Sequence, residues 1–300
     1  MIRRLAVWAG LLLATGLGAA SAQQLEPRAY VPVPVDVNVA GMPFVYQTGA
    51  VVTDPSLPFS NIDAHVETLA AFYDRSFAFF GHSATALVSV PWVWAQVSGE
   101  VFEQARRVTR SGLADMSMRF SANILGSPAL TPQEFAKTPI KPTLGASLTV
   151  TAPTGQYDGT KLINIGTNRW GFKPEVGLSV PTGPWTFEAY AGAWFYTPND
   201  DFFGGRRRTQ DPIPEFQGHV GYTFKPGLWL SIDGTWYSGG QTTTAGVLDD
   251  DRLKNTRVGA TFAVPLGHGN DIKLAGARGA TTRFGQNFTT VGLTFQHHWF

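Results

Sequence analysis

The residues of this sequence that could most clearly bind or conduct polar molecules are charged side chains at every second position. Between residues 172 and 180, Lys173 and Glu175 alternate with Phe172 and Pro174. Because successive side chains of a strand point to opposite faces, one face carries charge and the other is apolar. Such a charged face can line a water-filled passage or form ion pairs between neighbouring strands.

Most other segments that show this alternation also have charged or aromatic residues at the positions of the polar face. If the apolar face contacts lipid, a basic group turned to the bilayer midplane would cost about 2–4 kcal/mol, so these residues must face water or one another. The aromatic rings, which include Tyr196 and Tyr237, either stack weakly on an aromatic or sugar solute or fill space. We predict that the following residues line a lumen: Asp115, Arg119, Lys173, Glu175, Glu188, Tyr190, Trp194, His219, Trp229, Asp233, Arg257 and Lys273.

Other polar clusters have simpler interpretations. The acidic runs 200–201 and 249–251 could hold Ca²⁺, but their spacing matches no defined calcium loop, which favours solvated loops. The run 206–208 of three arginines can pair with nearby acids or with lipid phosphates. The six histidines form no H-x-x-H or HExxH pair, so the sequence predicts no metal site and no cofactor.

An outer-membrane lipid hydrolase would need a serine and a histidine near one rim of the barrel. Ser238 and His219 are the conceivable pair, although no G-x-S-x-G motif is present. We predict a protein that is not an enzyme, and lipid hydrolysis stays as an alternative.

The elements that position these residues are strands. The hairpin in 161–205 contains two of them, joined by the turn PTGP at 181–184. The whole chain predicts about twelve strands: 36–53, 62–80, 84–92, 115–124, 144–152, 172–180, 185–196, 219–224, 228–237, 257–264, 271–283 and 291–299.

The joins between these strands alternate in length. Those at 80–83, 181–184, 225–227 and 266–270 are short, whereas 99–110, 153–168, 199–212 and 239–254 are long and polar. This layout is typical of an outer-membrane barrel, with 127–141 as a possible periplasmic cap. A soluble sandwich or lipocalin-like barrel fits the same alternation turned inside out.

The two chain ends favour the membrane interpretation. Arg3 and Arg4 precede an apolar run, and an A-x-A site ends at Ala22, which predicts a signal peptide at 1–22 and a barrel at 23–300. The chain closes with Trp299 and Phe300; Trp299 continues the apolar face, and a terminal aromatic is a feature that the barrel-assembly machinery reads.

Composition narrows the remaining classes. The sequence has no cysteine, no run of roughly 20 apolar residues after the signal, and a formal charge of +1 that falls to about −1 without Arg3 and Arg4. A nucleic-acid partner would need a basic face, so none is expected.

Six motifs are distinctive along the chain: LEPRAY at 25–30, DPSLP at 54–58, SGLAD at 111–115, KLINIGTNRWGFKPE at 161–175, NDDFFGG at 199–205 and TRVGAT at 256–261. They resemble the family labelled putative MetA-pathway of phenol degradation, over nearly the entire mature chain. The resemblance implies an outer-membrane β-barrel, sometimes encoded near aromatic-compound catabolism and often labelled a transporter.

Together these features predict a single antiparallel up-and-down transmembrane β-barrel in the outer membrane of a Gram-negative bacterium. We expect passive passage of small solutes, including aromatic compounds such as phenolics. The alternative is a closed barrel with a structural or adhesive role. Expected partners are outer-membrane lipids, lipopolysaccharide, the barrel-assembly machinery and a small-molecule solute.

Overall fold

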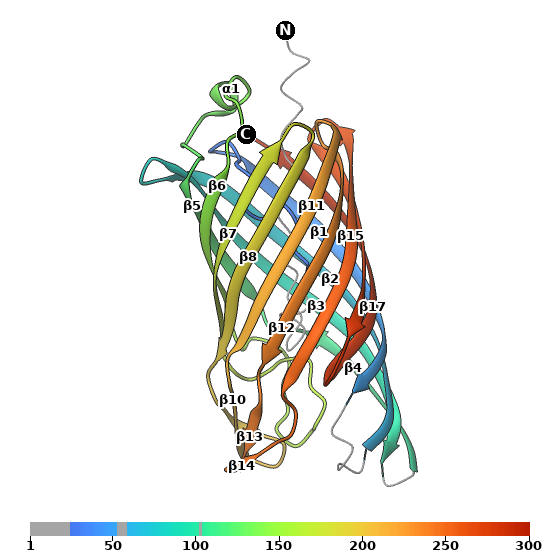
Figure 1. The fold of residues 1–300 in the computed structure, drawn as a ribbon. Coiled ribbons are helices and arrows are strands. Elements are labelled where there is room, and N and C mark those ends of the chain that lie inside the picture. The colour runs from blue at the N-terminus through green and yellow to red at the C-terminus, as the bar shows by residue number, and fades with distance from the viewer. Residues whose placement is uncertain (1–24, 53–58, 102–103) are drawn as a thin grey trace.

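The chain folds into a closed antiparallel barrel of 12 strands, as the sequence predicts (Figure 1). The structure is a computed structural model that describes residues 25–52, 59–101 and 104–300. The predicted signal peptide at 1–22 lies outside the described residues. Each strand pairs with its neighbours in an antiparallel ladder, so the backbone hydrogen bonds of the wall are made within the sheet, as a bilayer requires.

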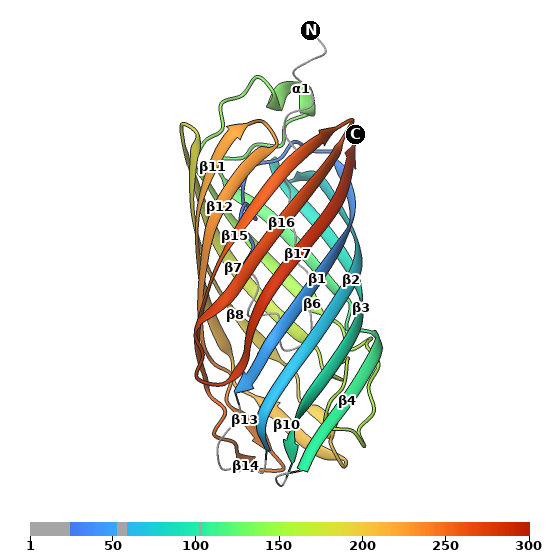
Figure 2. The same cartoon turned by 90° about the vertical axis from the view of Figure 1, so that its right-hand side faces the viewer.

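The consecutive strands β4 and β5 together form one of the 12 strands of the barrel. Both pair with β3, each along a different part of its length. The ladder of β1 with β17 and that of β1 with β2 complete the ring, and Figure 2 shows β1 beside β17. The wall consists of β1 (Asn38–Val52), β2 (Phe59–Phe79), β3 (His82–Val101), β4 (Gln104–Leu113), β5 (Ser117–Leu125), β6 (Thr143–Thr151), β7 (Gly171–Thr182), β8 (Trp185–Tyr196), β11 (Ile213–Lys225), β12 (Leu228–Gly239), β15 (Leu253–Gly267), β16 (Asn270–Thr281) and β17 (Gly285–Trp299).

The apolar face of the wall points outward. Val176 and Phe187 are 52% and 47% exposed, whereas Arg119 and Glu175, on the opposite phase, are 4% and 3% exposed. A soluble sandwich would show the reverse pattern, with the apolar side chains packed inside. The burial pattern therefore confirms the lipid-facing assignment made from the alternation.

The two ends of the barrel differ as predicted. One end carries short turns and the long connection from β5 to β6. The other carries long loops, two of which form a second small sheet, and the short join between β16 and β17 (Figure 1). This sheet contains β9 (Asn199–Phe202), β10 (Arg206–Gln210), β13 (Thr242–Thr244) and β14 (Val247–Leu248). Short turns face the periplasm in barrels of this type, which sets the orientation.

The predicted loop at 99–110 is wrong over most of its length. β3 continues to Val101 and β4 begins at Gln104, so that a hairpin extends beyond the loop end of the barrel (Figure 2). Cross-strand pairs from Trp92 with Leu113 to Val101 with Gln104 hold this extension together.

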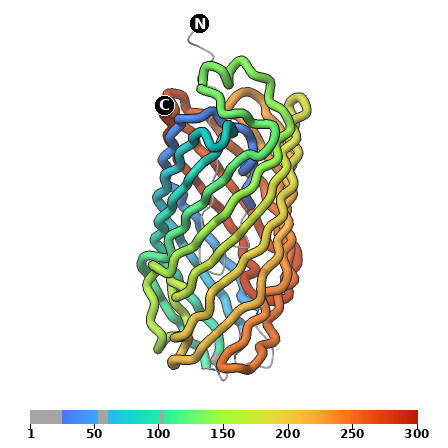
Figure 3. Tube along the Cα trace, turned by 90° about the vertical axis from the view of Figure 1, so that its left-hand side faces the viewer, coloured from blue at the N-terminus to red at the C-terminus, as the bar shows by residue number. Residues whose placement is uncertain are grey.

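The connection between β5 and β6 crosses the turn end of the barrel, near the C-terminus (Figure 3). It contains the short helix α1 (Pro132–Phe135), which begins with a capping box between Thr131 and Glu134. We call residues 127–141 the periplasmic cap. Among the described residues, no helix is long and apolar enough to cross a bilayer.

Candidate functional site: the barrel lumen

The lumen is occupied by the residues that precede β1. We call residues 25–37 the N-terminal segment. Its backbone is held by side chains of the inner wall: the Glu26 N–H donates to Gln217 Oε1 at 3.1 Å, and the Ala29 N–H donates to the Tyr190 hydroxyl at 3.1 Å. Because these donors have wall partners in place of water, the segment can be buried.

A buried charge network joins this segment to the wall. Arg119 Nη1 lies 2.6 Å from Glu26 Oε2, and its Nη2 lies 3.2 Å from Glu175 Oε1. Lys173 Nζ lies 3.0 Å from Glu175, 3.6 Å from Glu26 and 3.9 Å from Glu215. All five side chains are at most 5% exposed, so every charge in the network depends on its partners.

Tyr30 packs directly on the inner wall beside this network. Its hydroxyl lies 2.9 Å from Ser147 Oγ and donates to Glu175 Oε1 at 2.9 Å. The ring covers Gly145 and Gly177, whose missing side chains leave the space it occupies. The inner wall is thus shaped for this tyrosine.

A second set of contacts surrounds Arg28. Its N–H donates to Glu188 Oε2 at 2.8 Å, its Nη1 donates to Thr223 Oγ1 at 3.4 Å, and its guanidinium lies 4.9 Å from the centre of the Trp229 ring. Arg28 has a φ of +68°, a conformation that costs energy for a residue with a side chain. The wall therefore holds Arg28 in a strained backbone geometry.

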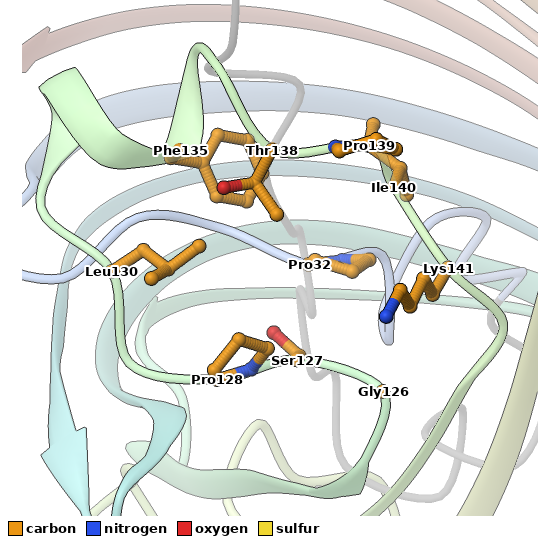
Figure 4. Close-up of a pocket in the computed structure, with 10 residues that line it drawn as sticks. All are labelled: Pro32, Gly126, Ser127, Pro128, Leu130, Phe135, Thr138, Pro139, Ile140 and Lys141. Carbon is orange, nitrogen blue, oxygen red and sulfur yellow. The ribbon is translucent and has the colours of Figure 1, made fainter.

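The end of the N-terminal segment is attached to the periplasmic rim. Ser76 Oγ donates to the Pro34 carbonyl at 2.7 Å, Ser83 Oγ donates to the Val33 carbonyl at 2.8 Å, and the Val35 N–H donates to the Leu130 carbonyl of the periplasmic cap at 2.9 Å. A small pocket lies between Pro32 and the cap (Figure 4). The segment and the cap thus form one assembly at this mouth.

All but one of the residues predicted to line the lumen lie on the inner face of a strand. The exception, Asp115, lies between two strands. Asp115 is in the break between β4 and β5, where it accepts hydrogen bonds from the Gly155 N–H and from the Thr167 N–H and hydroxyl. It holds the 152–170 loop against the wall. The remaining predicted residues are buried on the inner phase: Arg119, Lys173, Glu175, Glu188, Tyr190, Trp194, His219, Trp229, Asp233, Arg257 and Lys273.

The structure brings these residues into separate groups. Arg119, Lys173 and Glu175 share the charge network, whereas His219 Nδ1 lies 2.8 Å from Asp233 Oδ1 on the next strand. Arg257 Nη2 donates to Thr290 Oγ1 at 2.9 Å.

The hydrolase pair does not assemble. The Ser238 hydroxyl donates to the Leu253 carbonyl at 3.1 Å, and the nearest polar partner of His219 is Asp233. The acid and arginine runs pair with each other in the loops, as Arg207 with Asp200 at 2.8 Å and Arg208 with Asp251 at 3.3 Å. Within the described part of the chain, no group of three His, Asp or Glu side chains is placed to hold a metal ion.

Sequence reasoning missed Glu26, Arg28, Tyr30 and Glu215. Glu215 follows from the alternation, since Glu215, Gln217 and His219 share one phase of β11. The other three belong to the LEPRAY motif, which has no strand period. The motif marked them as distinctive, but only the fold reveals what they touch.

The fold and the polar lumen define an outer-membrane β-barrel. The family described as "Putative MetA-pathway of phenol degradation" matches residues 44–295, and the chain belongs to this family. No curated protein matches the chain.

Solved structures share the architecture at low sequence identity. The COG4313 outer membrane channel from Pseudomonas putida F1 aligns with a TM-score of 0.75 at 20% identity, over 92% of this chain and 100% of that one. The β domain of the Bordetella autotransporter BrkA aligns at 0.51 and 13% identity, over 88% and 100%. The transport unit of the autotransporter AIDA-I from Escherichia coli aligns at 0.51 and 8%, over 88% and 90%.

Proposed function

We propose that this protein is a passive outer-membrane channel for small solutes, and that the N-terminal segment closes its lumen in the state described above. The observation that carries the proposal is the way this segment is held. It contributes no strand to the wall, and its contacts within the barrel are hydrogen bonds, ion pairs, ring packing and one small apolar cluster around Tyr30 and Val33. With no cysteine in the chain, no disulfide fixes it.

The polar inner wall supports passage of solutes in water. A closed sheet with charged residues inside and apolar residues outside is the arrangement of barrels with a water-filled interior. The similar Pseudomonas putida F1 structure is described as an outer membrane channel, which agrees with this proposal.

We further propose that the solutes include small aromatic compounds. Rings on the inner wall, such as Tyr190, Trp194 and Trp229, offer faces against which a flat solute can stack. Charges of both signs lie between them, whereas a phosphate-selective passage would require a run of basic residues.

Single-channel recording of the purified protein in a planar bilayer tests conduction. We expect discrete steps that become larger and longer in a variant lacking residues 25–35, because the contacts of the segment are then absent. Silence of both proteins over many insertions would reject the channel. Uptake of radiolabelled phenol and benzoate, by cells with and without the gene, tests the solute class.

A closed barrel with a structural role is the second candidate. The observation in its favour is the tight packing of Tyr30 and Glu26 against the wall. In that case the shortened variant would conduct while the full-length protein would stay silent under all conditions. The same recording therefore separates the two candidates.

A further inference from the structure

We propose that the wall around Arg28 is a binding site for a small planar organic cation, and that such a cation displaces the N-terminal segment and opens the channel. This inference rests on the proposed function. In the closed state Arg28 fills the site as a tethered ligand. The site itself consists of Glu188 on β8, Thr223 on β11 and Trp229 on β12.

Three chemical features of this site favour a cation. The Trp229 face lies under the Arg28 guanidinium at 4.9 Å, which is the geometry of a cation–π contact. The Glu188 carboxylate supplies negative charge, and the Thr223 hydroxyl accepts a hydrogen bond. Glu188 and Trp229 are 6% and 2% exposed, so their attraction for a cation is weakly screened by water.

Arg28 fills this site imperfectly. Arg28 contacts Glu188 through its main-chain N–H and not through its guanidinium. Among the described residues, no carboxylate lies within 4.0 Å of this guanidinium. Within the same residues, Arg28 Nε and Glu188 Oε1 are buried without a hydrogen-bond partner. The positive φ of Arg28 adds backbone strain.

A free cation avoids these costs. An aryl amidinium that is not tied to the chain can direct its charge to Glu188 and its ring toward Trp229, the places that the Arg28 N–H and guanidinium now take. Its charged contact with Glu188 is stronger than a neutral hydrogen bond. Binding then removes the Arg28 contacts and biases the segment toward leaving the lumen, because the ligand favours the open state by its differential affinity. His219, next to Glu188 in the register, is already paired with Asp233 on its far side.

The test compares benzamidine, a planar cation at neutral pH, with benzamide, its uncharged analogue of nearly the same shape. In single-channel recordings at constant ionic strength, we expect benzamidine to raise the open probability at a concentration about tenfold lower than benzamide does, the ratio for one charge-assisted contact. Glu188→Gln should remove this difference. Glu67→Gln, which changes an exposed carboxylate on the outer face, should keep it.

The variant Arg28→Ala addresses the tethered ligand itself. It should conduct more than the native protein without any addition, and benzamidine should then occupy the empty site and reduce the current. Heat-dependent mobility in gels checks that each variant folds. Equal effects of benzamidine and benzamide on a conducting native protein would overturn the inference while leaving the channel intact.

A labelling experiment reports displacement even if no current is found. Since the chain has no cysteine, Ala29→Cys introduces a single buried thiol on the N-terminal segment. Benzamidine should accelerate its reaction with a water-soluble maleimide, and benzamide should not. Val247→Cys, on an exposed loop, should react quickly in all conditions. An unchanged labelling rate in the Ala29→Cys variant would reject the proposed site, whereas silence in recordings alone would reject only the channel.

Discussion

The ring of Tyr30 lies on the backbone of Gly177, in the place where any other residue would carry its β-carbon. The same ring forms a T-shaped contact with Tyr190 at a centroid distance of 4.9 Å, so the wall packs against it on a second side. The position of Tyr30 in the lumen thus depends on the absence of side chains at Gly177 and at its neighbour Gly145.

Gly177→Ala should loosen the N-terminal segment. Gly177 has no positive φ, so alanine fits the backbone, and the three atoms nearest to its β-carbon would all belong to the Tyr30 ring. We expect a higher basal current in single-channel recordings. Gly218→Ala, where an added β-carbon meets no atom within 4 Å, should leave the current unchanged. In a Tyr30→Ala background, Gly177→Ala should have no further effect; a persisting effect would contradict the packing argument.

Glu26→Gln should destabilise the closed protein. The substitution keeps the shape of the side chain but leaves Arg119 and Lys173 with less negative charge in a buried site. Removing one partner of a buried ion pair costs about 3–5 kcal/mol, and urea unfolding in lipid vesicles measures the loss. Asp36→Asn, which removes a largely exposed pair with Arg75, should cost less than about 1 kcal/mol. Similar losses in both variants would argue against the buried network.

Val176→Lys should impair membrane insertion. Val176 lies in the middle of β7 on the outer face and is 52% exposed, so a lysine there meets lipid. The expected cost is about 2–4 kcal/mol near the midplane, measured by folding yield into vesicles. Val247→Lys is the matched control, because that valine is also exposed but lies in the loop sheet. Normal folding of Val176→Lys would reverse the assignment of the two faces.

The periplasmic cap should weaken in acid. Hydrogen bonds from the Thr131 N–H and hydroxyl hold the pKa of Glu134 below its ordinary value. A carboxylate with a lowered pKa stabilises the folded form above its ordinary pKa, near 4.3, and the stabilisation is lost as pH falls through the lowered value. Amide exchange in α1, corrected for intrinsic rates, should therefore speed up between about pH 5 and 3. In the Glu134→Gln variant, amide exchange in α1 should not speed up over this pH range. If it still does, another titrating group is responsible.

The alternation of residues predicted the strands and their two faces, and the chain ends were needed to favour a membrane barrel over a soluble sandwich. Lys173, Glu175 and Glu188 were assigned to the lumen because each stands between apolar neighbours, and a two-residue period has one geometric meaning. The alternation is lost where the strands extend beyond the bilayer, since both faces are then polar. Arg106 and Arg107 of β4 looked like loop residues because both faces of that hairpin are polar there.

The position of the N-terminal segment could not be predicted in the same way. Its contacts join Glu26 and Tyr30 to residues more than 90 positions away, and they exist only after the sheet has closed. Proline-rich sequence without a period indicates an extended chain but gives no location. The matching signal, Gly145 beside Gly177 on adjacent strands, is visible in the sequence only once the register is known.

The polar interior of this barrel has a thermodynamic consequence for opening. Expulsion of the N-terminal segment would uncover charged and hydroxyl groups, such as Arg119 and Ser147, together with the apolar cluster that Tyr30 and Val33 form with Tyr190. Exposed apolar area raises the heat capacity and exposed polar area lowers it, so the two contributions to the heat capacity of opening should partly offset each other. Dissolved salt should also act on the balance between the two states, because it screens the charges once they meet water.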